Sequence, residues 1–247
     1  DVEPGASIKS VVPMARGIAC TTDGSAAFVP QEKMVATGYP VRPEIRAATN
    51  LPKEDALSQF DLAPDRKTLF VFGGSRGAQN INRTLMRILP ELLQHFQVIH
   101  ISGTLTWPEV KENLETLNAE QRGRYRPYPY LHGRMGAAFR AADLVVSRAG
   151  ASMLGEAPAF GVASILVPLT FAWRYQKVNA DYLTQRGAAV QLTDDTLHDQ
   201  LLPLVSELLG EDSRLAKMSR AAKALDKPDA TTHLADFIVG LAKEGRS

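Results

Sequence analysis

The stretch DLVVSRAGASMLGE, residues 143–156, decides the fold prediction because it joins an apolar run to a turn of small residues and an apolar helix. Residues 143–149 have the composition of a buried strand. A helix is predicted over 152–160, and the small residues before it leave backbone amides exposed at its start. A plain strand–helix connection needs neither Arg148 nor Glu156, so the stretch also marks a candidate binding site.

The same alternation of strands and helices extends over residues 67–192. Strands are predicted at 67–74, 97–103, 125–131, 143–149, 163–169 and 188–192. Helices are predicted at 77–95, 107–118, 134–142, 152–160 and 174–186, and in the tail at about 197–209, 212–225 and 230–244. Prolines in 125–131 suggest an edge strand or an irregular segment, and Pro108 is expected in the first turn of its helix. The pattern predicts βαβ units around a parallel, Rossmann-like sheet with flanking helices, an α/β fold.

The first part of the chain has a different pattern. Residues 17–22 and 33–41 could be strands of another sheet, and 42–66 form a polar, proline-bearing connector with one or two short helices.

Composition excludes several classes of protein. The 247 residues are 45% hydrophobic and 22% charged, which is typical of a globular protein, and the formal net charge of +1 gives no bulk field for nucleic acid. Cys20 is the only cysteine, which excludes an internal disulfide and a cysteine-rich metal site. The longest apolar run, 162–173, is too short to span a bilayer. The five histidines show no metal spacing.

Small and polar residues follow the predicted strands. Ligands bind at the carboxyl ends of such parallel strands, which here are Gly73-Gly74-Ser75, Ser102-Gly103, Leu131-His132-Gly133, Arg148-Ala149-Gly150 and Leu169-Thr170. The glycine turn at 72–80 suits a phosphate but is also compatible with a merely tight turn, since it matches neither dinucleotide nor Walker patterns. Strand 97–103 ends without an acid for a ribose, which argues against a dehydrogenase.

The turn at 150–156 suits a diphosphate and a diol. Gly150 to Ser152 bring free amides to a helix start, and a carboxylate such as Glu156 can accept two vicinal hydroxyls. The alternative is a solvated glutamate on an exposed face of the helix. The neighbouring residues are apolar and leave little room for such a face: Met153, Leu154, Ala157 and Phe160.

Four further side chains are weaker candidates. Gln176 and Asn179 share a helix face and could bind sugar hydroxyls, or belong to a solvated helix start. Arg42 lies between two prolines and suits a phosphate, or is an ordinary surface arginine. His132 lies at a strand end and is more typical of a packing residue than of a base.

Five motifs, in order, carry a family resemblance: GGSRGA (73–78), SRAGASMLGE (147–156), ILVPL (165–169), YQKVNADYLTQRGAA (175–189) and PDAT (228–231). Together they resemble the C-terminal half of the MurG family, bacterial transferases that move GlcNAc from UDP-GlcNAc to a lipid-linked muramyl-pentapeptide. The resemblance implies a GT-B fold, in which two Rossmann-like domains enclose a cleft. It implies a remnant of the N-terminal acceptor domain at 1–41, a UDP-sugar donor domain at 42–228, and a final helix at 229–247 that packs back toward the N-terminal domain.

The resemblance also implies donor contacts, position by position. Arg42 matches an arginine at the interdomain crossing, Ser75 a serine of the glycine loop, and Leu131-His132 the strand end that meets the uracil edge. The helix start at the diphosphate and ribose corresponds to Ala151, Ser152, Met153, Leu154 and Gly155. Glu156 matches the glutamate on the ribose hydroxyls, Gln176 a glutamine on the GlcNAc hydroxyls, Asn179 a neighbouring polar position, and Arg148 a supporting arginine.

Parts of the family pattern are absent. The N-terminal glycine-rich loop, its histidine and a His-Glu-Gln segment are missing, and Asp1 stands where that segment would end, without a methionine before it. Tyr175 occupies a position where another family glutamine occurs. We therefore expect a fragment or a processed form that binds donor but transfers no sugar alone, with the acceptor site, the base and the membrane-facing surface in the absent half.

The resemblance implies an inverting hexosyl transfer without a covalent enzyme intermediate, cofactor or metal, in the cytoplasm at the inner face of the cell membrane. Three alternatives stay open from the sequence. The first is a GT-B transferase with another lipid acceptor, such as a diacylglycerol. The second is a non-catalytic donor-binding subunit of a split transferase, against which residues 1–41 argue. The third is a UDP-GlcNAc epimerase, for which no acids and bases at the sugar are evident.

Overall fold

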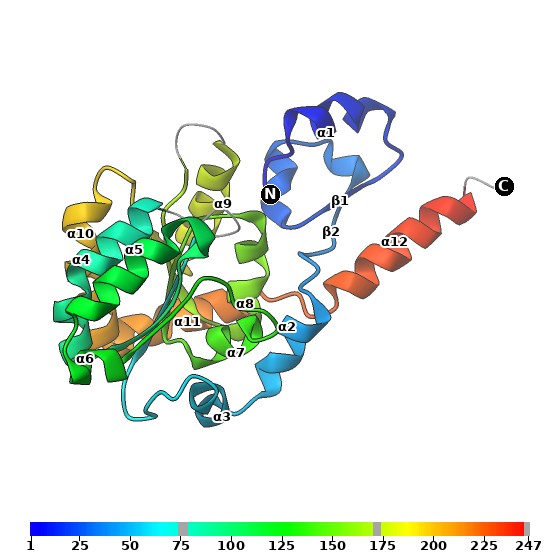
Figure 1. Cartoon of the computed structure of the whole chain (residues 1–247). Helices are drawn as coiled ribbons and strands as arrows, with labels where there is room; N and C mark the ends of the chain where they lie inside the picture. The colour runs from blue at the N-terminus through cyan, green and yellow to red at the C-terminus, as the bar shows by residue number, and fades with distance from the viewer. Residues whose placement is uncertain (74–78, 170–173, 245–247) are drawn as a thin grey trace.

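The computed structural model describes residues 1–73, 79–169 and 174–244, and its main feature is a six-stranded parallel sheet (Figure 1). The strands are β3 (Thr68–Phe72), β4 (Gln97–Ile101), β5 (Tyr125–Tyr128), β6 (Leu144–Ser147), β7 (Ala163–Leu166) and β8 (Ala189–Gln191). Their spatial order is β5-β4-β3-β6-β7-β8, the Rossmann order, which reverses direction between β3 and β6. The predicted α/β fold is confirmed. Strand β5 lies at one edge of the sheet, which was one of the two alternatives that its prolines left open.

Helices cover both faces of this sheet. The longer ones are α4 (Gln79–His95), α5 (Gly103–Thr116), α9 (Arg174–Gln185), α10 (Leu197–Gly210), α11 (Asp212–Ala224) and α12 (Ala230–Glu244). The shorter ones are α1 (Ala6–Val11), α2 (Pro43–Ala47), α3 (Lys53–Ser58), α6 (Ala119–Gly123), α7 (Met135–Ala141) and α8 (Glu156–Phe160), with a 3-10 turn, η5 (Ala151–Leu154), before α8. Helices α1 and α6 were not predicted.

The central strand β3 is buried along its whole length because helices lie against both of its faces. Leu69 and Val71 belong to one core cluster, with α4 and α10. Phe70 and Phe72 belong to the other, with α3, α7 and α9. Alternate side chains of one strand thus anchor two helical layers.

Helix α5 corrects one prediction. It begins at Gly103 rather than at 107, because β4 ends at Ile101 and Gly103 turns the chain with a φ of 74°. Pro108 therefore lies inside the helix and not in its first turn. Its missing amide leaves the Thr104 carbonyl oxygen without its intrahelical donor.

The N-terminal segment forms a second, two-stranded parallel sheet from β1 (Ile18–Cys20) and β2 (Met34–Ala36). Both strands fall within the ranges predicted for another sheet. This segment lies beside α9 (Figure 1), where the Val2 amide donates to Asn179 Oδ1 at 2.8 Å and the Tyr182 hydroxyl donates to Asp23 at 2.6 Å.

The chain crosses between this small sheet and the large one twice, and the two crossings touch. Gly38 has a φ of 99°, and a Cβ placed on it would lie 2.7 Å from Lys227 Cβ and 2.8 Å from Ala230 Cβ. Arg46 Nη1 donates to both carboxylate oxygens of Asp226, at 2.8 and 3.0 Å. Helix α12 then extends away from the main sheet (Figure 1). Its Phe237 lies against Gly17 of the small lobe, the N-terminal part of the chain that contains β1 and β2 (residues 1–36).

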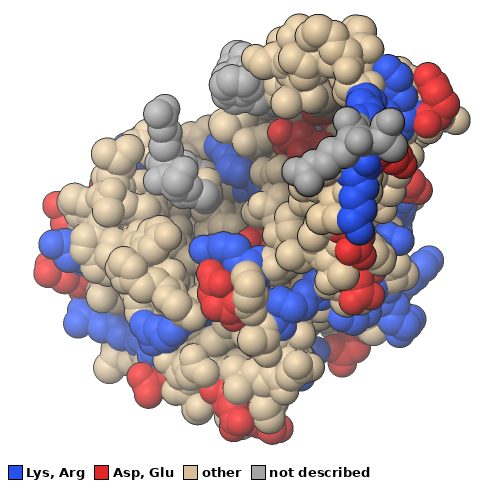
Figure 2. All heavy atoms as spheres, turned by 90° about the vertical axis from the view of Figure 1, so that its right-hand side faces the viewer, with Lys and Arg blue, Asp and Glu red and all other residues tan. Residues whose placement is uncertain are grey.

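The surface carries no single charged face in the view of Figure 2, where basic and acidic side chains are interspersed. Of the helices in the described parts of the chain, none combines the length and apolarity needed to cross a bilayer.

Substitution of Phe139 tests the packing of the core cluster that contains Phe70 and Phe72. Its ring is 1% exposed and lies 5.4 Å from the Phe70 ring, 5.6 Å from Phe72 and 5.4 Å from Phe160, between centroids. We expect Phe139→Ala to lower the free energy of unfolding by about 3–5 kcal/mol, because it leaves a cavity among these rings. Urea denaturation measures the loss, and Leu105→Ala, at an exposed position, should change stability by less than about 0.5 kcal/mol.

Candidate functional site

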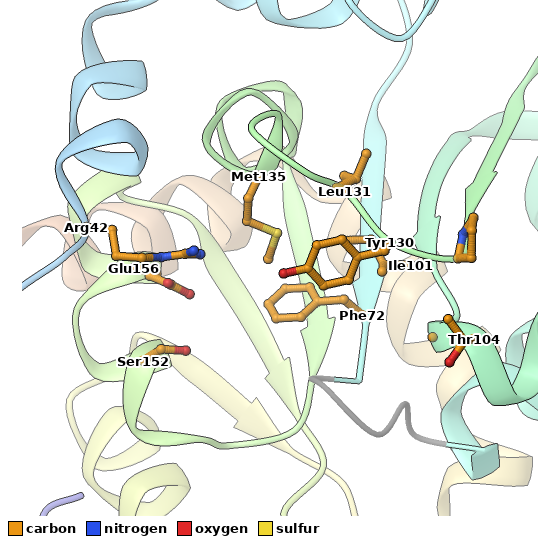
Figure 3. Close-up of a pocket in the computed structure, with 11 residues that line it drawn as sticks. Arg42, Phe72, Ile101, Thr104, Tyr130, Leu131, Met135, Ser152 and Glu156 are labelled. Carbon is orange, nitrogen blue, oxygen red and sulfur yellow. The ribbon is translucent and has the colours of Figure 1, made fainter.

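A pocket of about 250 Å³ opens at the carboxyl ends of β3, β4 and β5, beside the point where the strand order reverses (Figure 3). Open α/β sheets bind ligands at this position. The lining residues come from strand ends, the connector before α2 and the η5–α8 junction: Arg42, Phe72, Ile101, Gly103, Thr104, Pro129, Tyr130, Leu131, Met135, Ser152 and Glu156. The pocket lies at the carboxyl ends of the strands and includes Gly103 and Leu131 of the predicted strand ends, while Arg148 and Leu169 lie outside its lining.

Gly155 brings the connector against the η5–α8 junction. A Cβ on Gly155 would lie 2.8 Å from Tyr39 Cβ and 3.0 Å from Val41 Cγ2, closer than real Cβ contacts. The glycine therefore allows residues 39–41 to pass directly over the junction. Arg42 follows them and reaches the same pocket as Glu156.

Glu156 is a nearly buried carboxylate at the first residue of α8, with 6% of its surface exposed. Burial raises the pKa of this carboxyl above its ordinary value, while a hydrogen bond from Ser152 and the charge of Arg42 act in the opposite direction. Figure 3 shows the Arg42 and Glu156 side chains directed into the pocket. Burial also raises the pKa of the neighbouring Tyr39; the Glu156 charge adds to this rise and the Arg42 charge opposes it.

The opposite part of the pocket is apolar. Phe72, Ile101 and Leu131 contribute carbon surface, and the Tyr130 and Met135 side chains point into the same space (Figure 3). Thr104 adds a hydroxyl at the start of α5. A flat apolar wall facing a carboxylate and a guanidinium suits a ligand with an aromatic ring, hydroxyls and negative charge.

Among the described residues, no group of three or more His, Cys, Asp or Glu side chains is placed to hold a metal ion.

The sequence of this domain matches a known family. The model of the glycosyltransferase family 28 C-terminal domain matches residues 68–234. The chain belongs to glycosyltransferase family 28. The match covers the main sheet and all residues of the pocket lining except Arg42. Together with the named relatives of this chain, it confirms the MurG resemblance of the motifs.

Relatives with curated names agree with the family 28 assignment. A protein of Roseiflexus sp. (strain RS-1) named UDP-N-acetylglucosamine--N-acetylmuramyl-(pentapeptide) pyrophosphoryl-undecaprenol N-acetylglucosamine transferase is 35% identical over 95% of this chain. A protein of the same name from Desulforudis audaxviator (strain MP104C) is 37% identical over 88% of this chain. The chain spans only 61% and 59% of these two relatives.

Solved structures show the same fold. The crystal structure of Acinetobacter baumannii MurG has a TM-score of 0.71 at 24% identity, covering 97% of this chain and 65% of that chain. UDP-GlcNAc 2-epimerase from Neisseria meningitidis, bound to UDP-GlcNAc, has a TM-score of 0.63 at 12% identity, covering 93% of this chain and 62% of that chain. Both likenesses concern the arrangement of the backbone alone.

Within this family 28 domain, the turn predicted to bind the diphosphate is a 3-10 turn followed by a short helix, not one continuous helix. The side chains of Met153 and Leu154 are buried in the core and do not line this pocket. Only the Ser152 side chain and Glu156 from this segment line the pocket. The amides of Ala151 and Ser152, at the start of the turn, have no partner within it.

Arg148 lies behind the pocket. Its guanidinium donates to both carboxylate oxygens of Asp194, at 2.9 and 3.0 Å, and to the Val167 carbonyl oxygen at 3.0 Å. Asp194 also accepts from Asn80 of α4 at 3.1 Å. Arg148 is thus not in the pocket lining, and its supporting role at a donor stays a prediction.

Gln176, Asn179 and His132 also lie outside the pocket lining. Gln176 Oε1 accepts a hydrogen bond from the Leu169 backbone amide at 3.1 Å. Asn179 is fully buried, and besides the Val2 amide it contacts the Ala149 carbonyl oxygen at 3.0 Å and the Asp1 carboxylate at 2.7 Å. The His132 ring is exposed and lies against Tyr130, with 4.8 Å between ring centroids. Their contacts to a donor stay predictions, and Ser75 lies outside the described residues.

The motifs missed several residues of the pocket. Thr104, Tyr130 and Met135 line it, and Tyr39 lies against Gly155, the residue before Glu156. Tyr130 stands at the end of the predicted strand 125–131, so strand-end position alone was a usable signal. Nothing in the sequence marks Tyr39, because its approach depends on the distant Gly155.

Glu156→Gln tests the burial of this carboxyl through pH. The pKa of Glu156 is raised above 4.5 in the folded protein. As the pH rises, this carboxyl therefore ionises first in the unfolded chain, and the free energy of unfolding falls from about pH 4.5 until the folded-state pKa is passed. A glutamine at position 156 cannot ionise, so the variant does not lose this free energy. We expect the urea midpoint of the variant to exceed that of wild type by more at pH 7 than at pH 4.

The matched control is Glu54→Gln, which removes an exposed carboxylate. Its midpoint should differ from wild type by the same small amount at both pH values. A Glu156→Gln difference that is independent of pH would contradict the desolvation of this side chain.

Proposed function

We propose that this chain binds UDP-GlcNAc and supplies the donor-binding half of a transferase that moves GlcNAc to a lipid-linked muramyl-pentapeptide, the step from lipid I to lipid II in peptidoglycan synthesis. The observation that carries the proposal is the buried Glu156 carboxylate beside Arg42 in the pocket of a family 28 domain. The names of the relatives support the choice of sugar and acceptor.

The pocket chemistry fits the parts of the donor. The uracil would lie against the apolar wall near Leu131, where backbone groups of the β5–α7 loop can meet its edge. The ribose hydroxyls would donate to Glu156, and these hydrogen bonds would favour its ionised form. Arg42 and the amides of Ala151 and Ser152 would contact the diphosphate.

The same groups would assist departure of UDP. In an inverting transfer, the acceptor hydroxyl attacks the anomeric carbon, the bond to the diphosphate oxygen breaks, and negative charge grows on UDP. Arg42 and the η5 amides would stabilise that charge. A base must take the proton of the acceptor hydroxyl, and the proposal assigns the base and the acceptor site to parts of the relatives that this chain does not match.

The proposal extends to the organisation of the chain. Residues 1–41 are then a remnant of the acceptor domain, 42–228 the donor domain, and 229–247 a helix that returns toward the acceptor side. The contact of Phe237 with Gly17 supports this last point. The complete enzyme would act in the cytoplasm, in peripheral contact with the inner face of the cell membrane.

Isothermal calorimetry tests the donor claim. We expect the 247-residue chain to bind UDP and UDP-GlcNAc, UDP-glucose more weakly, and NAD not measurably. We expect it to transfer no sugar by itself. A preference for NAD over UDP-GlcNAc would overturn the proposal.

Glu156→Ala tests the ribose contact. Loss of charge-assisted hydrogen bonds worth about 1.5–3 kcal/mol should weaken UDP binding about 10- to 100-fold. Glu54→Ala, at an exposed carboxylate, should bind as wild type does. Unchanged affinity in Glu156→Ala would remove this residue from the ribose role.

A further inference from the structure

A chain of buried polar side chains crosses the core and ends beside the pocket. It runs through Tyr125 of β5, His100 of β4 and Asn82 of α4, which are 2%, 0% and 0% exposed. The Tyr125 hydroxyl lies 2.7 Å from His100 Nδ1, and His100 Nε2 lies 3.0 Å from Asn82 Oδ1. Asn82 Nδ2 donates to the Ser102 carbonyl oxygen at 2.7 Å.

The directions of these hydrogen bonds follow from the last one. The Ser102 carbonyl oxygen can only accept, so the Asn82 amide nitrogen faces it and the amide oxygen faces His100. That oxygen needs a donor, which is His100 Nε2–H. The neutral ring then accepts at Nδ1, and Tyr125 donates to it. Burial lowers the pKa of His100 to about 3, so the ring keeps this form at neutral pH.

The chain ends at one wall of the pocket. Ser102 lies between Ile101 and Gly103, which both line the pocket, and Thr104 follows. The Ser102 amide donates to the Tyr128 carbonyl oxygen at 3.0 Å, and Gly103 turns the backbone with its positive φ. The orientation of the Ser102 carbonyl group therefore sets where this wall stands.

The backbone of Asn82 belongs to the first turn of α4. Asn82 is the fourth residue of that helix, which follows the glycine-rich stretch 73–78 in the sequence. One amide side chain thus fixes two elements of the rim to each other. Apolar side chains of similar size would fill the same space without the desolvation of three polar groups. They would not supply a directed hydrogen bond to Ser102.

We propose that Asn82, oriented by His100 and Tyr125, is a positioning residue for the donor site. It holds the Ser102 carbonyl group, and with it Gly103 and Thr104, in the arrangement that receives the nucleotide. This inference rests on the proposed function for the identity of the ligand, and UDP is the probe.

The chain offers a matched control in Gln97. It lies on the same strand as His100 but at the end away from the pocket, and it is 1% exposed. Its side-chain amide is also fully engaged, with Ala63, Arg66 and Thr68. Asn82→Leu and Gln97→Leu each remove a buried amide at similar volume, so both should lower thermal stability.

Calorimetry with UDP separates positioning from stability. We expect Asn82→Leu to weaken UDP binding about tenfold, Tyr125→Phe two- to threefold, and Gln97→Leu less than twofold. Unchanged UDP affinity in Asn82→Leu, or an equal loss in Gln97→Leu, would overturn the proposal.

Hydrogen exchange of the Ser102 amide gives a second readout that needs no ligand. We expect faster exchange in Tyr125→Phe than in wild type and no change in Gln97→Leu. This readout decides the inference if Asn82→Leu fails to fold, and unchanged exchange in Tyr125→Phe would then overturn it. If wild type itself does not bind UDP, the proposed function fails, while the exchange comparison still tests the coupling from Tyr125 to Ser102.

Discussion

The close approach of Tyr39 to Gly155 is the constraint on which the pocket depends. Because Gly155 has no side chain, the connector passes directly over the η5–α8 junction. This contact brings Arg42 to Glu156, although they are far apart in the sequence. The strand order supplies the other half of the arrangement, since it places the end of β3 beside the end of β6. Packing at Gly155 thus places Arg42 and Glu156 in the lining of the same pocket.

Burial has two different effects at the two sides of the site. At Glu156 it disfavours the charged form, and Ser152 and Arg42 oppose that effect, so the carboxyl is prepared to gain from a ligand that donates hydrogen bonds. At His100 no charged partner opposes burial, and the ring stays neutral and serves as a fixed link. One group is poised to respond to a ligand, and the other holds a wall of the pocket in place.

Much of the fold could be predicted from the sequence, because apolar runs ending in small residues mark parallel strands directly. The burial of Glu156 was also predictable, because the neighbouring Met153, Leu154 and Ala157 are apolar and leave no solvent-exposed helix face. Features set by contacts between distant residues were not. The early start of α5 depends on the left-handed turn at Gly103, and the burial of Asn179 depends on the docking of Val2. Neither has a local signal.

The two crossings between the lobes lie side by side, with Gly38 against Lys227 and Ala230 and with Arg46 bound to Asp226 nearby. A side chain at Gly38 would collide with both Lys227 and Ala230, and a φ of 99° would strain any residue but glycine there. Tyr39 follows directly, so a substitution at Gly38 would displace the connector from Gly155 and with it the position of Arg42. One glycine outside the pocket lining therefore helps to determine the shape of that lining.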